Sequence, residues 1–158
     1  WLEDVQPRSL VDLYCGVGLF SLPLAKKSRK LAGFESHFGA IQSAQANARR
    51  NRVGNALFAT ADLSRPDAVH GLTKTAGFTP NLVLADPPRT GLSKPLLDWL
   101  CHTHPARLVY VSCNPGSLAR DLAQLLTRGG YQLTSCTPAD LFPRTNHVES
   151  VSLLVHRP

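Results

Sequence analysis

Short apolar runs alternate with stretches of helical character along the chain. The runs that predict strands are 9–14, 30–35, 56–61, 81–86, 108–111, 131–137 and 148–156. The stretches that predict helices are 22–25, 38–51, 64–76, 95–102 and 115–128. Strands and helices that alternate at these lengths form a doubly wound, mostly parallel α/β sheet. The last two strands have no helix between them, so we expect a seven-stranded sheet with an antiparallel hairpin at one edge.

Glycine positions suggest where the helices end. The helix at 115–128 is the clearest, because its leucines recur at helical spacing and two glycines follow it. By the same rule we expect Gly54 to end the helix at 38–51. We also expect Gly77 to end one continuous helix at 64–76.

Length and composition suit a single globular domain that covers residues 1–158. The chain has 158 residues and a hydrophobic content of 43%, which is enough to build a full core. No apolar run approaches the roughly 20 residues that cross a membrane, and no signal peptide is visible. We therefore expect a cytoplasmic protein without a membrane partner. The chain begins at Trp1 and contains no Met, from which we expect a domain of a longer protein.

The charge balance is basic. Lys and Arg number 17 against 11 Asp and Glu, a net charge of +6. This balance suits a polyanionic partner such as nucleic acid, although many basic domains have none. Arg49, Arg50 and Arg52 cluster at the end of one predicted helix, as either a solvated face or an RNA contact. The four cysteines are spaced too widely for a metal site or a disulfide framework, so we expect reduced thiols and no metal.

The turn after the first predicted strand carries a Gly-x-Gly pattern. Gly16 and Gly18 would let a ligand approach the backbone closely, although simple tight turns carry the same pattern. Ser21 replaces the third glycine of the dinucleotide fingerprint, so phosphate binding is not indicated. Glu35 ends the next strand, where nucleoside-binding folds place a carboxylate for the ribose. The alternative role of Glu35 is that of an acid near a helix start.

Two further acids follow predicted strands. Asp62 comes after the third strand, and Asp86 ends the fourth and most apolar one. Asp86 is followed by two prolines and Arg89, and prolines after a buried strand make a stiff loop with few alternative shapes. A stiff loop at a strand end suits a reaction site; otherwise it is a simple turn with a solvated arginine.

Cys113 lies between a predicted strand and a predicted helix. Asn114 is a good N-cap residue, and Pro115 suits the first helical position. The positive end of that helix would favour a thiolate, so Cys113 is a candidate nucleophile. The alternative is a buried structural thiol. All five strand ends should open on one edge of the sheet, where α/β folds bind their ligands.

Four segments of the chain together resemble the RNA uracil-C5 methyltransferase family. They are Asp-Leu-Tyr-Cys-Gly-Val-Gly-Leu-Phe-Ser at 12–21, Asp-Pro-Pro-Arg-Thr-Gly at 86–91, Ser-Cys-Asn-Pro at 112–115 and His-Val-Glu-Ser at 147–150. They occur in the family's order, and the resemblance covers nearly the whole chain. It implies a Rossmann-like class I methyltransferase that uses S-adenosylmethionine, with rRNA or tRNA as its substrate.

The resemblance also implies catalytic roles. Cys113 would add to carbon 6 of a uracil, which makes carbon 5 able to accept a methyl group, and Glu149 would then remove the proton from carbon 5. From the residues alone, His147 is an equally suitable base. The resemblance assigns cofactor contacts to seven positions, which are Tyr14, Gly16, Gly18, Leu19, Glu35, Asp62 and Asp86. Leu19 departs from the family, which often has a polar residue there, so we expect no side-chain hydrogen bond from it.

Two other functions are compatible with parts of the sequence. An RNA cytosine-C5 methyltransferase would use the same thiol addition, but its fourth motif usually carries Pro-Cys where this chain has Asp86-Pro87-Pro88. A non-catalytic module that binds cofactor or RNA would not need Cys113 and Glu149. Family members carry an upstream portion that contacts RNA. We therefore expect this chain to fold and bind cofactor but to methylate RNA poorly, with no obligate protein partner evident.

Overall fold

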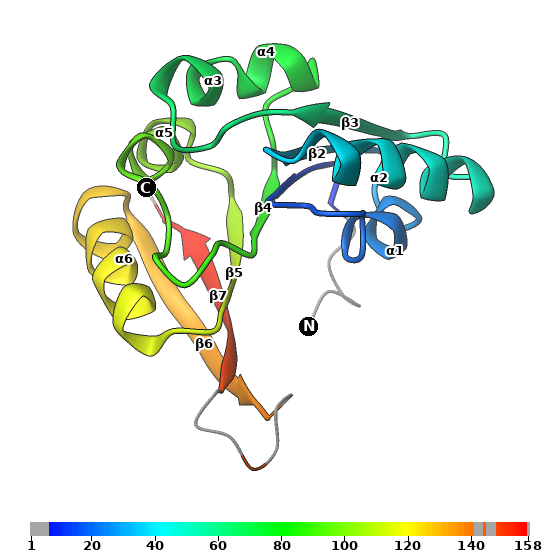
Figure 1. The fold of residues 1–158 in the computed structure, drawn as a ribbon. Helices are drawn as coiled ribbons and strands as arrows, with labels where there is room; N and C mark the ends of the chain where they lie inside the picture. The colour runs from blue at the N-terminus through cyan, green and yellow to red at the C-terminus, as the bar shows by residue number, and fades with distance from the viewer. Residues whose placement is uncertain (1–6, 141–143, 145–147, 158) are drawn as a thin grey trace.

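The computed structural model describes residues 7–140, 144 and 148–157, whose strands form one sheet (Figure 1). The strands are β1 (Ser9–Leu13), β2 (Lys30–Glu35), β3 (Ala56–Thr60), β4 (Leu82–Ala85), β5 (Arg107–Ser112), β6 (Tyr131–Ala139) and β7 (Glu149–His156). The sheet has seven strands in the order β3-β2-β1-β4-β5-β7-β6. β1 to β5 are parallel, whereas β7 is antiparallel to both β5 and β6. The predicted doubly wound, mostly parallel sheet with an antiparallel hairpin at one edge is confirmed.

Helices cover both faces of this sheet (Figure 1). On one face, α1 (Ser21–Ala25) and α2 (Phe38–Arg50) share a core with Leu10 and Leu31. On the other face, Val11 and Leu13 belong to a larger core. The helices that contribute to this second core are α3 (Pro66–His70), α4 (Leu72–Ala76), α5 (Lys94–Thr103) and α6 (Pro115–Arg128). Consecutive residues of β1 therefore serve opposite faces, as the pleat of a strand requires.

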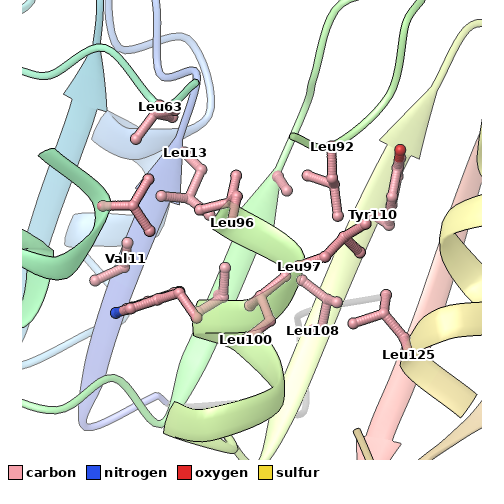
Figure 2. Packing of buried hydrophobic residues seen from close by; sticks show 14 of the residues in the cluster. Val11, Leu13, Leu63, Leu92, Leu96, Leu97, Leu100, Leu108, Tyr110 and Leu125 are labelled. Atoms are coloured by element: carbon pink, nitrogen blue, oxygen red, sulfur yellow. The ribbon is translucent and has the colours of Figure 1, made fainter. Parts of the chain in front are cut away.

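α5 provides much of the larger core (Figure 2). Its Leu96 and Leu100 are fully buried, as are Val11 and Leu108 of the strands beneath. Burial of one leucine side chain contributes about 1.5–3 kcal/mol. The packing fixes the carboxyl ends of β1, β4 and β5 relative to one another, which is what a site built across several strands requires.

The expectation of one continuous helix at 64–76 is wrong. Two short helices, α3 and α4, occupy this segment and meet at Gly71. The Gly71 N–H is shared between the carbonyls of Asp67 and Ala68 at 3.2 Å each, which closes α3. Glycine has a weak helix propensity, so the turn is not extended through it.

The expectation that Gly54 ends α2 is also wrong. α2 ends at Arg50, with Asn51 as its C-cap. The Arg52 N–H donates to the Arg49 carbonyl at 3.1 Å, and the Val53 N–H donates to the Ala48 carbonyl at 2.9 Å. These are the two bonds of a Schellman motif. Arg52 therefore takes the left-handed position, with φ of 55°, that glycine usually fills.

Candidate functional site

The predicted site residues gather at one edge of the sheet. Tyr14, Gly16 and Gly18 follow β1, while Glu35 is the last residue of β2. Asp62, Asp86 and Cys113 follow β3, β4 and β5. Because these five strands are parallel, their carboxyl ends meet at a single edge, which is the usual ligand edge of an α/β sheet.

β7 adds the last of the predicted residues to the same edge. It runs antiparallel to β5, so its first residue lies where β5 ends, and Ser112 pairs with Ser150 in the register. The Ser150 hydroxyl donates to the Ser112 carbonyl at 3.3 Å. Cys113 and Glu149 are the next residues beyond this pair. The other candidate base, His147, lies outside the described residues.

The loop after β1 has an unusual backbone. Gly16 and Gly18 have φ of 53° and 89°, and Tyr14 also has a positive φ, 63°. A tyrosine in the left-handed region is strained, and such strain is concentrated at functional sites. A Cβ added to Gly16 would meet no atom within 4 Å, so this glycine borders open space. Leu19 is 73% exposed on this loop.

Asp12 is a buried acid of the first motif, and no role was predicted for it. It is 1% exposed, and its Oδ2 accepts a hydrogen bond from the Ser21 hydroxyl. Its Oδ1 has no partner among the described residues. Burial, and to a lesser extent the charge of Asp86, raise the pKa of Asp12 to about 7, although the Ser21 bond opposes them. The signal available in the sequence was an acid within an apolar strand.

Glu35 accepts two hydrogen bonds at the start of α2. Its Oε1 receives the Ser36 hydroxyl and the His37 backbone N–H, both at 2.9 Å. Burial would raise the pKa of Glu35, but these bonds, together with the backbone N–H groups of Ser36 and Gly16, hold it below its usual value. Glu35 is therefore a carboxylate beside the β1 loop. The position also suits the alternative role of an acid near a helix start.

A pocket with a volume of about 550 Å³ opens between the ends of β1 and β3 and the loop after β4. Tyr14 and Asp62 line it, as do Ser36, Leu63 and Leu97. Asp62 accepts the Ser64 hydroxyl at 2.6 Å and the Ser64 N–H at 3.0 Å, which keep its pKa below the usual value. The other predicted cofactor residues do not line this pocket. Gly18 and Leu19 border a separate hollow that includes Asn47.

Asp86 begins a loop that several hydrogen bonds attach to α6. The Asn114 side chain donates to the Arg89 carbonyl at 3.1 Å, and Arg120 donates to the Thr90 carbonyl at 2.8 Å. These bonds connect the loop to the helix that follows Cys113. Burial, followed by the nearby charge of Glu149, raises the pKa of Asp86. The predicted stiff loop is thus held by named contacts as well as by its prolines.

Asp121 of α6 holds this loop in place through hydrogen bonds, a role that was not predicted from the sequence. Its side chain is fully buried, and its Oδ2 accepts the Leu92 N–H and the Tyr110 hydroxyl, each at 2.7 Å. Its Oδ1 accepts Arg120 Nε at 2.9 Å and Nη2 at 2.7 Å. A Cβ on Gly91 would lie 2.5 Å from Asp121 Oδ2, so glycine is required there. The available signal was an acid among the leucines of an apolar helix face.

Cys113 lies between β5 and α6 as predicted. Asn114 caps α6 by accepting the Gly116 N–H at 2.9 Å, and Pro115 occupies the first turn. Cys113 is half-buried, whereas Cys15 and Cys101 are buried and Cys136 is exposed, and all four are free. The expected effect of the helix on the thiol remains a prediction.

Within 7–140, 144 and 148–157, no three His, Cys, Asp or Glu side chains are placed to hold a metal ion. No helix in those residues has the length and apolar character to cross a membrane.

Sequence comparison identifies relatives over nearly the whole chain. A model of the tRNA (uracil-5-)-methyltransferase family matches residues 2–157. An uncharacterized RNA methyltransferase of Thermosynechococcus vestitus is 45% identical over 154 residues, covering 98% of this chain and 33% of the relative. The 23S rRNA (uracil(1939)-C(5))-methyltransferase RlmD of Aeromonas hydrophila is 42% identical over 153 residues, covering 97% and 34%. The chain thus spans about a third of the length of these relatives.

Structural comparison agrees. The crystal structure of the Pyrococcus abyssi tRNA (uracil-54, C5)-methyltransferase, in complex with S-adenosyl-L-homocysteine, matches with a TM-score of 0.77 and 36% identity. The match covers 92% of this chain and 34% of that one. A ribosomal protein L11 methylase from Lactobacillus delbrueckii matches with a TM-score of 0.69 at 13% identity, covering 98% and 73%. The second match shows a shared fold alone. Together with the sheet order, these matches establish a Rossmann-like class I methyltransferase fold.

Proposed function

Because the chain belongs to the tRNA (uracil-5-)-methyltransferase family, we propose that it transfers a methyl group from S-adenosylmethionine to carbon 5 of a uridine in RNA. The observation that carries the proposal is the position of Cys113 and Glu149. A thiol and a carboxylate lie one residue beyond the same strand pair, Ser112 and Ser150, at the ligand edge of the sheet. The relatives named above act on 23S rRNA and on tRNA, so both remain candidate substrates.

The residues around the β1 loop fit the proposed cofactor. Its sulfonium supplies an electrophilic methyl group when bound, and its positive charge suits a site rich in carboxyl groups. Asp12 has a buried oxygen without a partner among the described residues, and the raised pKa values of Asp12 and Asp86 reflect burial together with neighbouring acids. A cation nearby would relieve that repulsion. We assign Glu35 to the ribose hydroxyls, Asp62 to the adenine, and Tyr14, Gly16, Gly18 and Leu19 to contacts along the β1 loop.

Catalysis would proceed through Cys113. After losing its proton, its sulfur would form a bond to carbon 6 of the uracil, and the electrons of the 5,6 double bond would make carbon 5 a nucleophile. Carbon 5 would then take the methyl group as the bond between that methyl group and the cofactor's sulfur breaks. Glu149 takes the proton from carbon 5, the double bond re-forms, and the bond between sulfur and carbon 6 breaks. We assign Asp86, which directly follows β4 and whose pKa burial raises, to a contact between the cofactor and the base.

An RNA that contains 5-fluorouridine tests the mechanism. Fluorine at carbon 5 cannot leave as a proton, so an active enzyme is trapped as a covalent adduct after methyl transfer. We expect mass spectrometry to locate the adduct on Cys113 when S-adenosylmethionine is present. The Cys113→Ala variant should give no adduct, whereas Cys136→Ala, which removes an exposed cysteine on β6, should give as much as the parent. No adduct at saturating RNA and cofactor would contradict the proposal.

The same experiment separates the alternatives. A cytosine-C5 methyltransferase would be trapped by 5-fluorocytidine and not by 5-fluorouridine. A non-catalytic module would bind cofactor or RNA without forming an adduct with either.

A further inference from the structure

Eight basic side chains surround the amino ends of β1, β2 and β3, on the edge opposite the candidate site. α1 and α2 lead back from the ligand edge to the starts of these strands, so their last residues arrive at the same place (Figure 1). All eight side chains are exposed. We call this set the basic edge, and its members are Arg8, Lys26, Lys27, Arg29, Lys30, Arg49, Arg50 and Arg52.

Hydrogen bonds hold the segments of the basic edge together. The Lys30 N–H donates to the Arg8 carbonyl at 3.2 Å, which joins the starts of β1 and β2. The Asn55 side chain donates to the carbonyls of Ala25 and Ser28 at 2.7 and 2.8 Å, which joins the end of α1 to the start of β3. Hydrogen bonds between segments therefore fix the backbone that carries these cations.

Among the described residues, the segments that form the basic edge carry no acidic side chain. Glu35 is the only acid between residues 13 and 61, and it lies at the opposite edge of the sheet. The ion pairs within the described residues use Arg65, Lys94, Arg120 and Arg128, none of which belongs to this set. Clustered cations without partners produce a positive potential that attracts polyanions.

Arg52 indicates that the charge serves a purpose. Arg49 and Arg50 lie in the last turn of α2, where cations are favoured by the helix dipole alone. Arg52 lies beyond the helix, in a left-handed conformation that glycine adopts without strain. An arginine in this strained position is consistent with a role for its charge.

A hollow adjoins the basic edge. Its volume is about 500 Å³, and Lys30, Asn55, Leu57 and Phe78 are among the residues that line it. Leu57 is 43% exposed, so the hollow combines an apolar surface with a cation. This combination suits a nucleotide, because a base can pack on the apolar surface while its phosphate meets Lys30.

We propose that the basic edge binds phosphate groups of the RNA at a distance from the reaction site. The choice of RNA as the polyanion rests on the proposed function. Strands of five or six residues separate the two edges by about 17–20 Å. A trinucleotide centred on the target uridine does not reach across this distance, whereas a folded RNA does. The basic edge therefore distinguishes large folded RNA from short RNA.

Paired variants test this inference. Lys27→Gln with Arg29→Gln removes two charges from the basic edge, and Arg107→Gln with Arg157→Gln removes two from the β5–β7 half of the same sheet edge. The probes are tRNA and 23S rRNA-fragment transcripts, beside a short single-stranded RNA with one uridine. We expect the first variant to bind the folded transcripts about tenfold more weakly. The slope of log K against log salt concentration should be smaller in magnitude by about 1.5 for this variant than for the parent. Its binding of the short RNA and of S-adenosylhomocysteine should not change. Equal losses in the two variants would overturn the proposal.

The Arg52→Gly variant distinguishes a role of Arg52 in RNA binding from a role in stabilising the fold. The glycine relieves the backbone, so the melting temperature should rise by about 2–4 °C, while binding of the folded transcripts weakens severalfold. Unchanged RNA binding in this more stable variant would contradict the inference.

Two further outcomes separate this inference from the proposed function. Weaker transcript binding in the basic-edge variant, without any 5-fluorouridine adduct in the parent, would support RNA binding by the basic edge and contradict the proposed methyltransferase activity. Adduct formation in the parent, with unchanged transcript binding in the variant, would support the activity and contradict RNA binding by the basic edge. Binding of anionic phospholipid vesicles, but of neither transcript, would overturn the choice of RNA.

Discussion

Cys113 lies across from Glu149 at the end of the β5–β7 ladder, one residue beyond the pair formed by Ser112 and Ser150. A strand that ran parallel to β5 would have put Glu149 at the other edge of the sheet. The antiparallel direction of β7 is therefore what brings a thiol and a carboxylate to one edge of the sheet, although they lie 36 positions apart in the sequence.

Glu149→Gln should stop the reaction after methyl transfer. Without a base, the proton on carbon 5 remains and the sulfur cannot leave, so an adduct should accumulate even on ordinary uridine RNA. We expect turnover to fall by about 10²–10⁴. Denaturing gel electrophoresis of the protein with labelled RNA measures the adduct. The control is Asp140→Asn, an exposed acid close to the end of β6. A variant that retained turnover would exclude Glu149 as the base.

Asp121→Ala should loosen the loop that follows Asp86. The change leaves the Tyr110 hydroxyl and the Leu92 N–H buried without an acceptor and removes the partner of Arg120. We expect the free energy of unfolding to fall by about 3–5 kcal/mol, as measured by urea denaturation. Asp98→Asn is the matched control. It removes an acid that pairs with Lys94 and Arg128 at the surface, where such pairs contribute about 0–1 kcal/mol. Equal losses in the two variants would refute the role of Asp121 as an anchor.

Asp12 should make stability depend on pH. Its pKa is about 7 in the folded chain and 3.8 ordinarily, so between these values the folded state holds a proton that the unfolded state has released. The free energy of unfolding should therefore fall as the pH rises from about 4 to about 7, by at most about 1.4 kcal/mol per unit. Asp12→Asn should lack this component. Urea denaturation at pH 5 and pH 8 measures it, and parallel pH profiles for parent and variant would show that Asp12 is ionised when folded.

Glu35→Ala should abolish cofactor binding. We expect the parent to bind S-adenosylhomocysteine with a Kd in the micromolar range, about −8 kcal/mol, in isothermal calorimetry. Asp67→Ala is the control, since Asp67 is exposed and pairs only with Arg65 among the described residues. Binding that survived in Glu35→Ala would remove the ribose assignment. If the parent itself does not bind, residues outside this chain build part of the cofactor site.

Much of this structure follows from local sequence pattern. The apolar runs predict the strands, and the residue types at their ends predict which side chains meet at the ligand edge, because parallel strands share one direction. Asn114 and Pro115 predict the start of α6 through capping rules that involve only neighbouring residues.

Long-range contacts set the remainder. Nothing near Asp121 in the sequence indicates that it accepts a hydrogen bond from Leu92, 29 residues away. The end of α2 depends on a Schellman motif with arginine in the place of glycine, which a rule based on glycine cannot find. Asp12 stood in a motif, but its burial, and its lack of a second partner within the part of the chain that the structure describes, are properties of the folded core.

The position of β7 between β5 and β6 has a consequence for synthesis of the chain. β6 pairs with β7 alone among the described strands, so it has no neighbour in the sheet until β7 has been made. β7 is made after both β5 and β6, joins the two at once, and brings Glu149 to the sheet edge that carries Cys113. A growing chain therefore carries the thiol before the opposing carboxylate, and the two reach one edge in the step that completes the β5-β7-β6 part of the sheet.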